Sequence, residues 1–230
     1  MIPKIIHQVW EGRKEPLPDF YIQLGATWKQ YHPEWQYELW NGDRMEALLD
    51  SCYPHLAKLY FDLRYDVQRW DFIRYLILYK MGGMYVDFDY ECLASFDSYT
   101  TGNQCFFAME PEAHRRMFGK DIYFNNALML TPPGHPFFAH IIARLQTAPI
   151  TYTGRKMHDV LQTTGPLMLT SLYETYKDKN TVGIFPAEWV SPLSKTEVKR
   201  WIDKTADMNI LEKKMDKVIA IHYFLGSWLA

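Results

Sequence analysis

The sequence predicts an α/β fold in which helices flank a central mixed, mostly parallel sheet, and a single domain that spans residues 1–230. Three observations carry this prediction. Runs of β-branched and aromatic residues alternate with segments of helical character along the chain. No Ser/Gly-rich linker, internal repeat or low-complexity tract divides it. The length of 230 residues fits one large domain with a substantial interior.

The first elements are expected to form a β-α-β unit. Residues 4–10, KIIHQVW, are rich in β-branched side chains and stop at a Gly/Pro loop, which predicts a strand. A helix is expected over 19–32. The alternation of large and polar residues in WQYELWN, 35–41, predicts a second strand. Such a unit is the building block of parallel sheets.

A buried helix is then expected to lead into a short strand. Residues 65–81 are apolar on most sides and stop at Gly82-Gly83, which is typical of a helix end. The next residues, MYVDFD at 84–89, predict a strand. Further strands are expected at 104–109, 126–131, 181–185 and 217–224, and helices at 136–147 and 166–177. We interpret the polar stretches 110–121 and 194–217 as solvated loop and surface helix.

Composition and charge exclude several classes of protein. The net charge is −2 and the basic residues are dispersed, so no nucleic-acid partner is expected. The three cysteines lack a C-x-x-C spacing, which argues against a disulfide framework and a structural zinc site. No apolar run reaches the roughly 18 residues of a membrane span, and the first residues do not look like a signal peptide. We therefore expect a cytoplasmic location.

Two aspartates one residue apart, Asp87 and Asp89, follow the third predicted strand. Residues two apart share a face of a strand, so both carboxylates should project together, in line with Tyr85 and Glu91 if the strand stays regular. Carboxylates so close repel unless a cation neutralises them. Mg²⁺ or Mn²⁺ fits, because such an ion takes one or two carboxylates and fills its other positions with water and phosphate oxygens. Alone, the pattern is more typical of a strand-end turn capped by surface aspartates.

The preceding helix carries two charged residues on one face, Asp71 and Arg74. Because the rest of this helix is apolar, the two side chains must contact each other or a ligand. The glycine pair that ends the helix leads directly into the D-x-D strand, which should place all four charged residues near one crevice.

The segment 64–93, RYDVQRWDFIRYLILYKMGGMYVDFDYECL, resembles the core motif of glycosyltransferases with a D-x-D sugar-binding region. This is the family 32 type, which includes yeast initiating mannosyltransferases and bacterial capsule and lipopolysaccharide enzymes of polysaccharide biosynthesis, and it is distantly similar to glucosylating toxins. Further matches occur in the family's order: IPKIIHQVW (2–10), WQYELWN (35–41), NALMLTPPGHPFF (126–138), TGP (164–166) and HYFLGSW (222–228).

The resemblance implies a GT-A fold and a hexosyltransferase that depends on Mn²⁺ or Mg²⁺ and retains the anomeric configuration. The expected donor is a nucleotide-diphosphate sugar, with a UDP-sugar first and GDP-mannose second. The expected acceptor is a glycan or a lipid-linked intermediate. A lipid-linked acceptor would bring the protein to the inner face of the membrane as a peripheral protein, and a C-terminal extension is conceivable on this sequence.

The resemblance also implies roles for individual residues. Asp71 and Arg74 should bind the donor sugar hydroxyls and a phosphate, and Asp87, beside Tyr85, should contact ribose or sugar. Asp89 and His222 should bind the metal. The remaining expected donor contacts are Trp10 near the base, Asn126 on the sugar or acceptor side, and Ser227 and Trp228 over the diphosphate.

Two positions depart from the family pattern. Trp70 stands where a small serine is common before the helix aspartate, and Gln68 replaces an alanine-like residue, so the shape of the sugar pocket is open. Two other functions also remain open. One is a catalytically weak nucleotide-sugar or carbohydrate-binding protein. The other is a metal-dependent phosphohydrolase, which would release phosphate or nucleotide without needing an acceptor.

Overall fold

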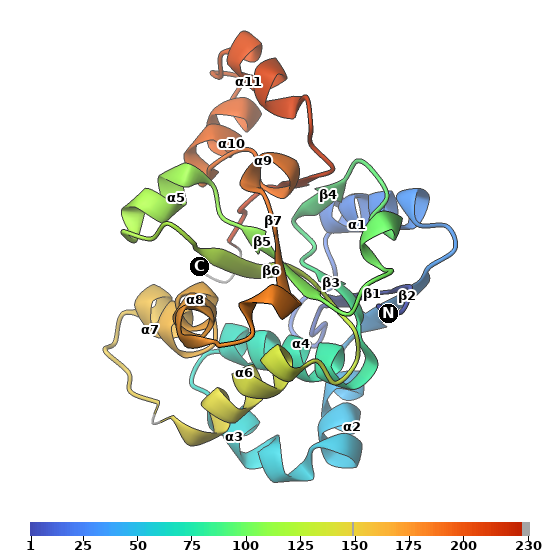
Figure 1. Cartoon of the computed structure of the whole chain (residues 1–230), viewed down its shortest axis with the longest axis vertical. Coiled ribbons are helices and arrows are strands. Elements are labelled where there is room, and N and C mark those ends of the chain that lie inside the picture. The colour runs from blue at the N-terminus through green and yellow to red at the C-terminus, as the bar shows by residue number, and fades with distance from the viewer. Residues whose placement is uncertain (149, 227–230) are drawn as a thin grey trace.

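A six-stranded mixed sheet runs through the middle of the molecule (Figure 1). The structure is a computed structural model that describes residues 1–148 and 150–226. The strand order is β2-β1-β3-β6-β5-β7, in which β6 is antiparallel to both neighbours and the other pairs are parallel. A separate antiparallel pair joins β4 and β8. The strands are β1 (Ile5–Val9), β2 (Gln36–Trp40), β3 (Gly83–Val86), β4 (Tyr90–Cys92), β5 (Cys105–Met109), β6 (Phe124–Thr131), β7 (Val182–Phe185) and β8 (Ala220–His222).

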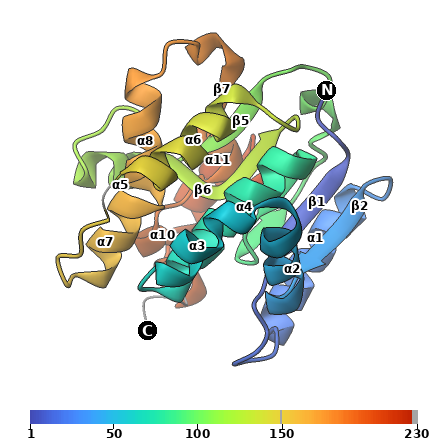
Figure 2. The ribbon, with the colours of Figure 1, turned by 90° about the horizontal axis from the view of Figure 1, so that it is seen from below.

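Helices cover both faces of this sheet (Figures 1 and 2). Side chains of α2, α3, α4, α6 and α8 pack on one face, and those of α1, α9 and the β4–β8 pair pack on the other. The α-helices are α1 (Asp19–Tyr31), α2 (Gly42–Cys52), α3 (Ala57–Asp62), α4 (Asp66–Met81), α5 (Glu112–Met117), α6 (Pro136–Thr147), α7 (Lys156–Thr163), α8 (Pro166–Thr175), α9 (Ala187–Val190), α10 (Lys195–Ile202) and α11 (Met208–Met215). Short 3₁₀ turns lie at η1 (Pro54–Leu56), η2 (Asp97–Tyr99) and η3 (Lys179–Thr181).

Helix α4 is the element that carries the predicted charged residues into the interior. At its start the backbone N–H of Tyr65 donates to the side chain of Gln68 at 3.1 Å, which helps to fix the first turn. At its end Gly82 has φ +66° and Gly83 has φ +95°, values that favour glycine. A Cβ on Gly83 would lie 2.6 Å from the carbonyl oxygen of Ile5, so only glycine lets β3 approach β1 here.

The order of the strands brings distant residues to one edge of the sheet. Trp10, Asp87 and Glu110 follow the carboxyl ends of β1, β3 and β5. Because β6 runs the other way, its first residues, including Asn126, lie at the same edge. In open α/β sheets the crevice outside the carboxyl ends of the strands is the usual place for a ligand.

The structure confirms the predicted β-α-β start, the buried helix and the α/β architecture, with differences at three places. The strand ends at Val86, so Asp87 and Asp89 lie in the turn before β4 rather than on one regular strand. Glu91 therefore does not share their face, and it accepts a hydrogen bond from Tyr223 at 2.6 Å.

The second and third differences concern the segments 217–224 and 110–121. Only Ala220–His222 of the former is a strand, and it pairs with β4 outside the main sheet. The latter contains helix α5, which has no buried residue and is a surface helix as expected, but Glu110 before it is buried and lines a cleft. None of the helices among the described residues is long and apolar enough to cross a bilayer.

Candidate active site

A cleft of about 780 Å³ opens at the carboxyl edge of the sheet. Its walls come from β1, the turn after β3, the start of β6, helices α4, α5 and α7, the start of α10, and β8. Of the residues that the sequence predicted, the structure brings eight to this cleft: Trp10, Asp71, Arg74, Tyr85, Asp87, Asp89, Asn126 and His222. The other two, Ser227 and Trp228, lie outside the described residues.

A buried hydrogen-bond network holds Asp71 at the floor of the cleft. Asn126 Nδ2 donates to Asp71 Oδ1, and Thr164 Oγ1 donates to Oδ2, both at 2.8 Å. Asn126 Nδ2 also donates to the Tyr75 hydroxyl at 3.0 Å. Asp71 is only 4% exposed and Arg74 only 5%, and a guanidinium nitrogen of Arg74 lies 3.4 Å from Asp71 Oδ1. The predicted contact between the two charged residues of α4 is therefore present.

Arg74 links this network to the turn after β3. Its Nη1 lies 3.2 Å from Asp87 Oδ1 and donates to the carbonyl oxygen of Asn126 at 3.0 Å. The Tyr85 hydroxyl donates to Asp87 Oδ1 at 2.5 Å, and the Arg74 guanidinium lies 4.5 Å from the centre of the Tyr85 ring. Asp87 and Tyr85 thus share a side as predicted, although Asp87 is already in the turn.

Burial dominates the ionisation of these groups. It raises the pKa of Asp71 to about 6, against the opposing effects of Arg74, Thr164 and Asn126. It also raises the pKa of Asp87, against the charge of Arg74. The carboxylates remain incompletely compensated by one guanidinium, so a cation or a hydroxyl that reaches them gains a strong partner. Buried groups with shifted pKa values in a cleft are typical of functional sites.

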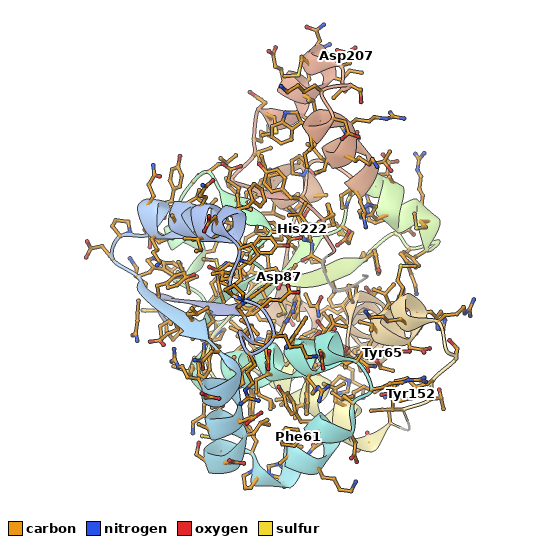
Figure 3. The ribbon with its side chains drawn as sticks, turned by 180° about the vertical axis from the view of Figure 1, so that it is seen from behind. Phe61, Tyr65, Asp87, Tyr152, Asp207 and His222 are labelled. Atoms are coloured by element: carbon orange, nitrogen blue, oxygen red, sulfur yellow. The ribbon has the colours of Figure 1, made fainter. Side chains whose placement is uncertain are left out.

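Asp89 and His222 form the second polar centre of the cleft. Figure 3 shows His222 and Asp87, which line the same cleft, in the middle of the molecule. Asp89 Oδ1 lies 3.2 Å from His222 Nε2, and the backbone N–H of Leu225 donates to Asp89 Oδ2 at 2.9 Å. Tyr90 stacks on the His222 ring at 4.3 Å. Burial favours the neutral forms, but mutual attraction lowers the pKa of Asp89 and raises that of His222. The two side chains therefore act as an ion pair.

The spacing of this pair fits a divalent cation. Ligands on neighbouring corners of an octahedron lie about 3 Å apart when each is 2.0–2.1 Å from the ion, and the Asp89–His222 separation matches. A bound cation would replace the proton on the imidazole. Within residues 1–148 and 150–226 no group of three or more His, Cys, Asp or Glu side chains could hold a metal. A site with two protein ligands leaves most positions for water and substrate oxygens.

Aromatic side chains form another part of the wall. The Trp10 ring lies 5.7 Å from that of Tyr21 and 6.2 Å from that of Phe88, which it meets edge-on. Trp10 Nε1 donates to the carbonyl oxygen of Glu15 at 3.0 Å, which fixes the indole. Trp70, the departure from the family pattern, also lines the cleft. Gln68 is buried away from it and donates to Thr163.

Two cleft residues were not predicted from the sequence, Glu110 and His114. Glu110 is buried and accepts a hydrogen bond from His114. They lie in the stretch that was interpreted as solvated loop and surface helix, directly after the strand predicted over 104–109, so the position of Glu110 at a predicted strand end was the available signal. Thr164 was noted as part of the TGP motif, but its bond to Asp71 was not expected.

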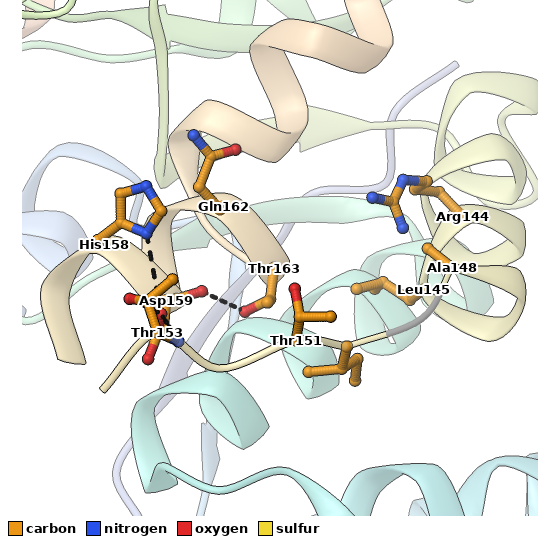
Figure 4. A pocket seen from close by; sticks show the side chains of 10 residues that line it. Arg144, Leu145, Ala148, Thr151, Thr153, His158, Asp159, Gln162 and Thr163 are labelled. Atoms are coloured by element: carbon orange, nitrogen blue, oxygen red, sulfur yellow. Dashed lines mark hydrogen bonds and ion pairs between the residues drawn. The ribbon is translucent and has the colours of Figure 1, made fainter. Parts of the chain in front are cut away.

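A second, smaller cavity of about 290 Å³ lies beside α6 and α7 (Figure 4). Asp159 in its wall accepts hydrogen bonds from the backbone N–H groups of Thr153 and Gly154 and from the Thr153 hydroxyl. These contacts anchor the segment before α7. The cavity lacks the charged cluster of the larger cleft, which is the better candidate for a site.

Comparisons with known proteins show which family this chain resembles. Residues 18–106 match the family model described as glycosyltransferase sugar-binding region containing DXD motif. Inositol phosphoceramide mannosyltransferase 3 of Schizosaccharomyces pombe is 30% identical over 176 residues, covering 76% of this chain and 46% of that protein. The initiation-specific alpha-1,6-mannosyltransferase of Candida albicans is 24% identical over 205 residues, covering 76% and 53%. The chain spans about half the length of the curated relatives it matches.

A solved structure supports the fold. The UDP-bound glycosyltransferase domain from the YGT toxin aligns with a TM-score of 0.51 and 10% identity, covering 93% of this chain and 89% of that one. This likeness confirms the predicted GT-A fold. Asp87 and Asp89 lie inside the matched segment and are its D-x-D residues. Residues 18–106 of this chain are therefore a glycosyltransferase sugar-binding region containing a DXD motif, the family that the sequence predicted.

Proposed function

We propose that this protein is a metal-dependent, retaining glycosyltransferase that moves a hexose from a nucleotide-diphosphate sugar to a glycan or glycolipid acceptor. The observation that carries the proposal is the meeting of two centres in one cleft. One is the buried Asp71–Arg74–Asp87 network, and the other is the Asp89–His222 pair. A pure binding protein would not need both a sugar-sized polar floor and a cation pair.

Each part of a nucleotide-diphosphate sugar would have a partner among the residues of the cleft. The base would lie against the aromatic wall at Trp10, where stacking favours a flat ring. The sugar hydroxyls would donate to Asp71 and Asp87, which are already fixed by neutral and charged donors. Asp89 and His222 would hold the cation, and the Arg74 guanidinium would face a phosphate.

Bond cleavage leaves additional negative charge on the departing diphosphate. Arg74 is charged and fixed by three oxygen contacts, from Asp71, Asp87 and Asn126, so it can stabilise that charge without reorganising. A bound divalent ion would supply Lewis acidity at the same place.

Retention of configuration is proposed from the family resemblance. Both oxygens of Asp71 accept hydrogen bonds, and both oxygens of Asp87 contact Arg74 or Tyr85, so both carboxylates are held in place by the protein. For the retaining route we propose a same-face displacement in which the leaving phosphate takes the acceptor's proton, because it needs no protein nucleophile. A trapped glycosyl-enzyme would rule this route out.

The two relatives described above are mannosyltransferases by name, which supports mannose as the transferred hexose. We therefore propose GDP-mannose as the donor, ahead of the UDP-sugar first expected from the sequence. The name of one of these relatives contains inositol phosphoceramide, a glycolipid precursor, which supports a glycolipid as the acceptor.

A hydrolysis and transfer assay tests the proposal. Purified protein is incubated with Mn²⁺ and radiolabelled GDP-mannose, UDP-glucose or UDP-galactose, with and without glycoside acceptors. We expect consumption of one donor that is accelerated by an acceptor and lost in Asp89→Asn. The matched control is Asp97→Asn, which changes an exposed aspartate outside the cleft. Release of inorganic phosphate or nucleotide that no acceptor accelerates would favour the phosphohydrolase instead.

A further inference from the structure

Glu110 lies in the wall of the cleft. It follows the carboxyl end of β5, beyond residue 106, where the matched region stops. The β5–β6 register shifts between Phe107 and Met109, just before Glu110. Its backbone N–H then resumes the ladder by donating to Tyr123 at 2.8 Å. Such a bulge changes which way the next side chain points, and bulges are frequent beside active sites.

A chain of hydrogen bonds holds the Glu110 carboxylate. The backbone N–H of Lys195, the first residue of α10, points at His114 Nε2 at 3.1 Å. A backbone N–H can only donate, so Nε2 accepts and the proton of the neutral ring is on Nδ1. His114 Nδ1 lies 2.6 Å from Glu110 Oε2 and donates to it. Helices α5 and α10 thus fix one oxygen of Glu110.

The other oxygen, Oε1, has no hydrogen-bond or ion-pair partner in the part of the chain that the structure describes. Glu110 is only 5% exposed, and it lines the cleft. Oε1 is not among the fully buried unpaired polar atoms of the described residues, so water in the cleft reaches it. A hydroxyl of a ligand in the cleft can replace that water as the donor.

The charge of Glu110 decides which part of the substrates it can meet. A carboxylate repels phosphate oxygens, so it cannot serve the diphosphate of the donor. In the proposed function the donor sugar already has Asp71 and Asp87 as partners. Glu110 lines the same cleft as the Asp89–His222 pair. A neutral hydroxyl of the second substrate is the remaining partner.

We propose that Glu110 is the acceptor-binding residue of this cleft: its free oxygen accepts a hydrogen bond from a hydroxyl of a sugar or cyclitol acceptor. His114 is the positioning residue that holds the carboxylate at the proper angle. The inference rests on the proposed transferase function and adds to it the place of the second substrate, between α5 and the start of α10. Glu110 binds the hydroxyl and takes no proton from it.

The test separates acceptor binding from donor chemistry. Donor hydrolysis without acceptor, and transfer to methyl α-D-mannopyranoside or to myo-inositol, are measured for the wild type and for Glu110→Gln. Loss of a hydrogen bond to a charged group should raise the acceptor KM by about 10- to 100-fold. Donor hydrolysis and the thermal shift caused by the nucleoside diphosphate should stay within about twofold of the wild type, because neither involves this wall.

Control variants guard against a merely structural effect. Glu112→Gln changes an exposed glutamate of α5 that pairs with Arg116. It should leave the acceptor KM, the donor hydrolysis and the thermal shift unchanged. His114→Gln should raise the acceptor KM less than Glu110→Gln does. Glu110→Asp keeps the charge but shortens the side chain by one methylene, so it should fold normally and still bind the acceptor more weakly.

Three results would overturn the assignment. An unchanged acceptor KM in Glu110→Gln would show that the carboxylate does not meet the acceptor. A parallel loss of donor hydrolysis would place Glu110 at the donor or in the fold. A wild type that hydrolyses the donor but transfers to neither probe would exclude this acceptor class. A wild type that neither binds nor hydrolyses any donor would instead refute the proposed function, on which the assignment depends.

Discussion

His7 gives the most quantitative prediction, because it is fully buried between the strands that position the cleft. Trp40 Nε1 donates to His7 Nδ1 at 3.1 Å, and His7 Nε2 lies 2.9 Å from the carbonyl oxygen of Gly82. An indole N–H can only donate, so Nδ1 is the acceptor and Nε2 carries the proton of a neutral ring. A second proton would have to enter between Nδ1 and the indole N–H, which the packing forbids.

The expected consequence is a loss of stability in mild acid. Burial lowers the pKa of His7 to about 4, whereas an unfolded histidine titrates near 6.5. Between these values the unfolded chain binds one proton more than the folded chain, so the free energy of unfolding falls as the pH falls. Integration from pH 7.5 to pH 5.0 gives a loss of about 2 kcal/mol from His7 alone, and about 3.4 kcal/mol once the pH is below both values.

Urea unfolding at pH 7.5 and pH 5.0 measures this loss. His7→Gln removes the titration, so its stability should fall by about 2 kcal/mol less than that of the wild type over this interval. His32 and His135, whose pKa values burial also lowers, are present in both proteins and cancel. His55→Gln, a change at an exposed histidine, should behave as the wild type. Equal pH dependence in His7→Gln and the wild type would show that His7 is not held neutral.

Three further substitutions test the scaffold and the floor of the cleft. Gly83→Ala should lower the free energy of unfolding by more than about 2 kcal/mol, because Gly83 has φ +95° and a Cβ would meet the Ile5 carbonyl oxygen. The control Gly119→Ala, at a residue with φ +62° and open space around it, should cost about 1 kcal/mol in the same urea titration. Thr164→Val should cost about 1–3 kcal/mol because Asp71 loses a charged hydrogen bond, and an unchanged melting curve would contradict that bond. Arg74→Lys should lower kcat/KM for transfer by roughly 100-fold, since one ammonium cannot replace a guanidinium that contacts three oxygens, and activity within a few fold of wild type would contradict its assigned place.

Local pattern was enough to predict the parts of the fold that depend on near neighbours. The apolar run and the terminal glycines predict the helix that contains Asp71 and Arg74, and residues three apart on a helix must lie on one face. The β-α-β unit at the start of the chain was predicted from local pattern as well. The turn at Asp87 was not predicted, because the sequence MYVDFD continues its strand-like alternation past Val86, where β3 ends, without a Gly or Pro to mark a turn.

The rest of the site depends on contacts between residues far apart in the sequence. His222 meets Asp89 because β8 pairs with β4, a contact that only the family resemblance suggested. Glu110 and His114 escaped notice because a bulge in β5, formed against β6, aims one of them into the cleft, and the start of α10 orients the other. Composition alone does not distinguish a polar stretch that lines a cleft from a polar stretch that is a solvated loop.

The most direct measurement is the thermal shift of the purified protein with GDP, UDP, CDP and ADP, each with Mn²⁺ or with EDTA, for the wild type and Asp89→Ala. A ligand that binds only the folded state raises the melting temperature. A cation held by the Asp89–His222 pair and a diphosphate should give a shift for one nucleotide that requires both Mn²⁺ and Asp89. A shift that persists in EDTA or in Asp89→Ala, or none with any nucleotide, would contradict a metal-linked donor site in this cleft.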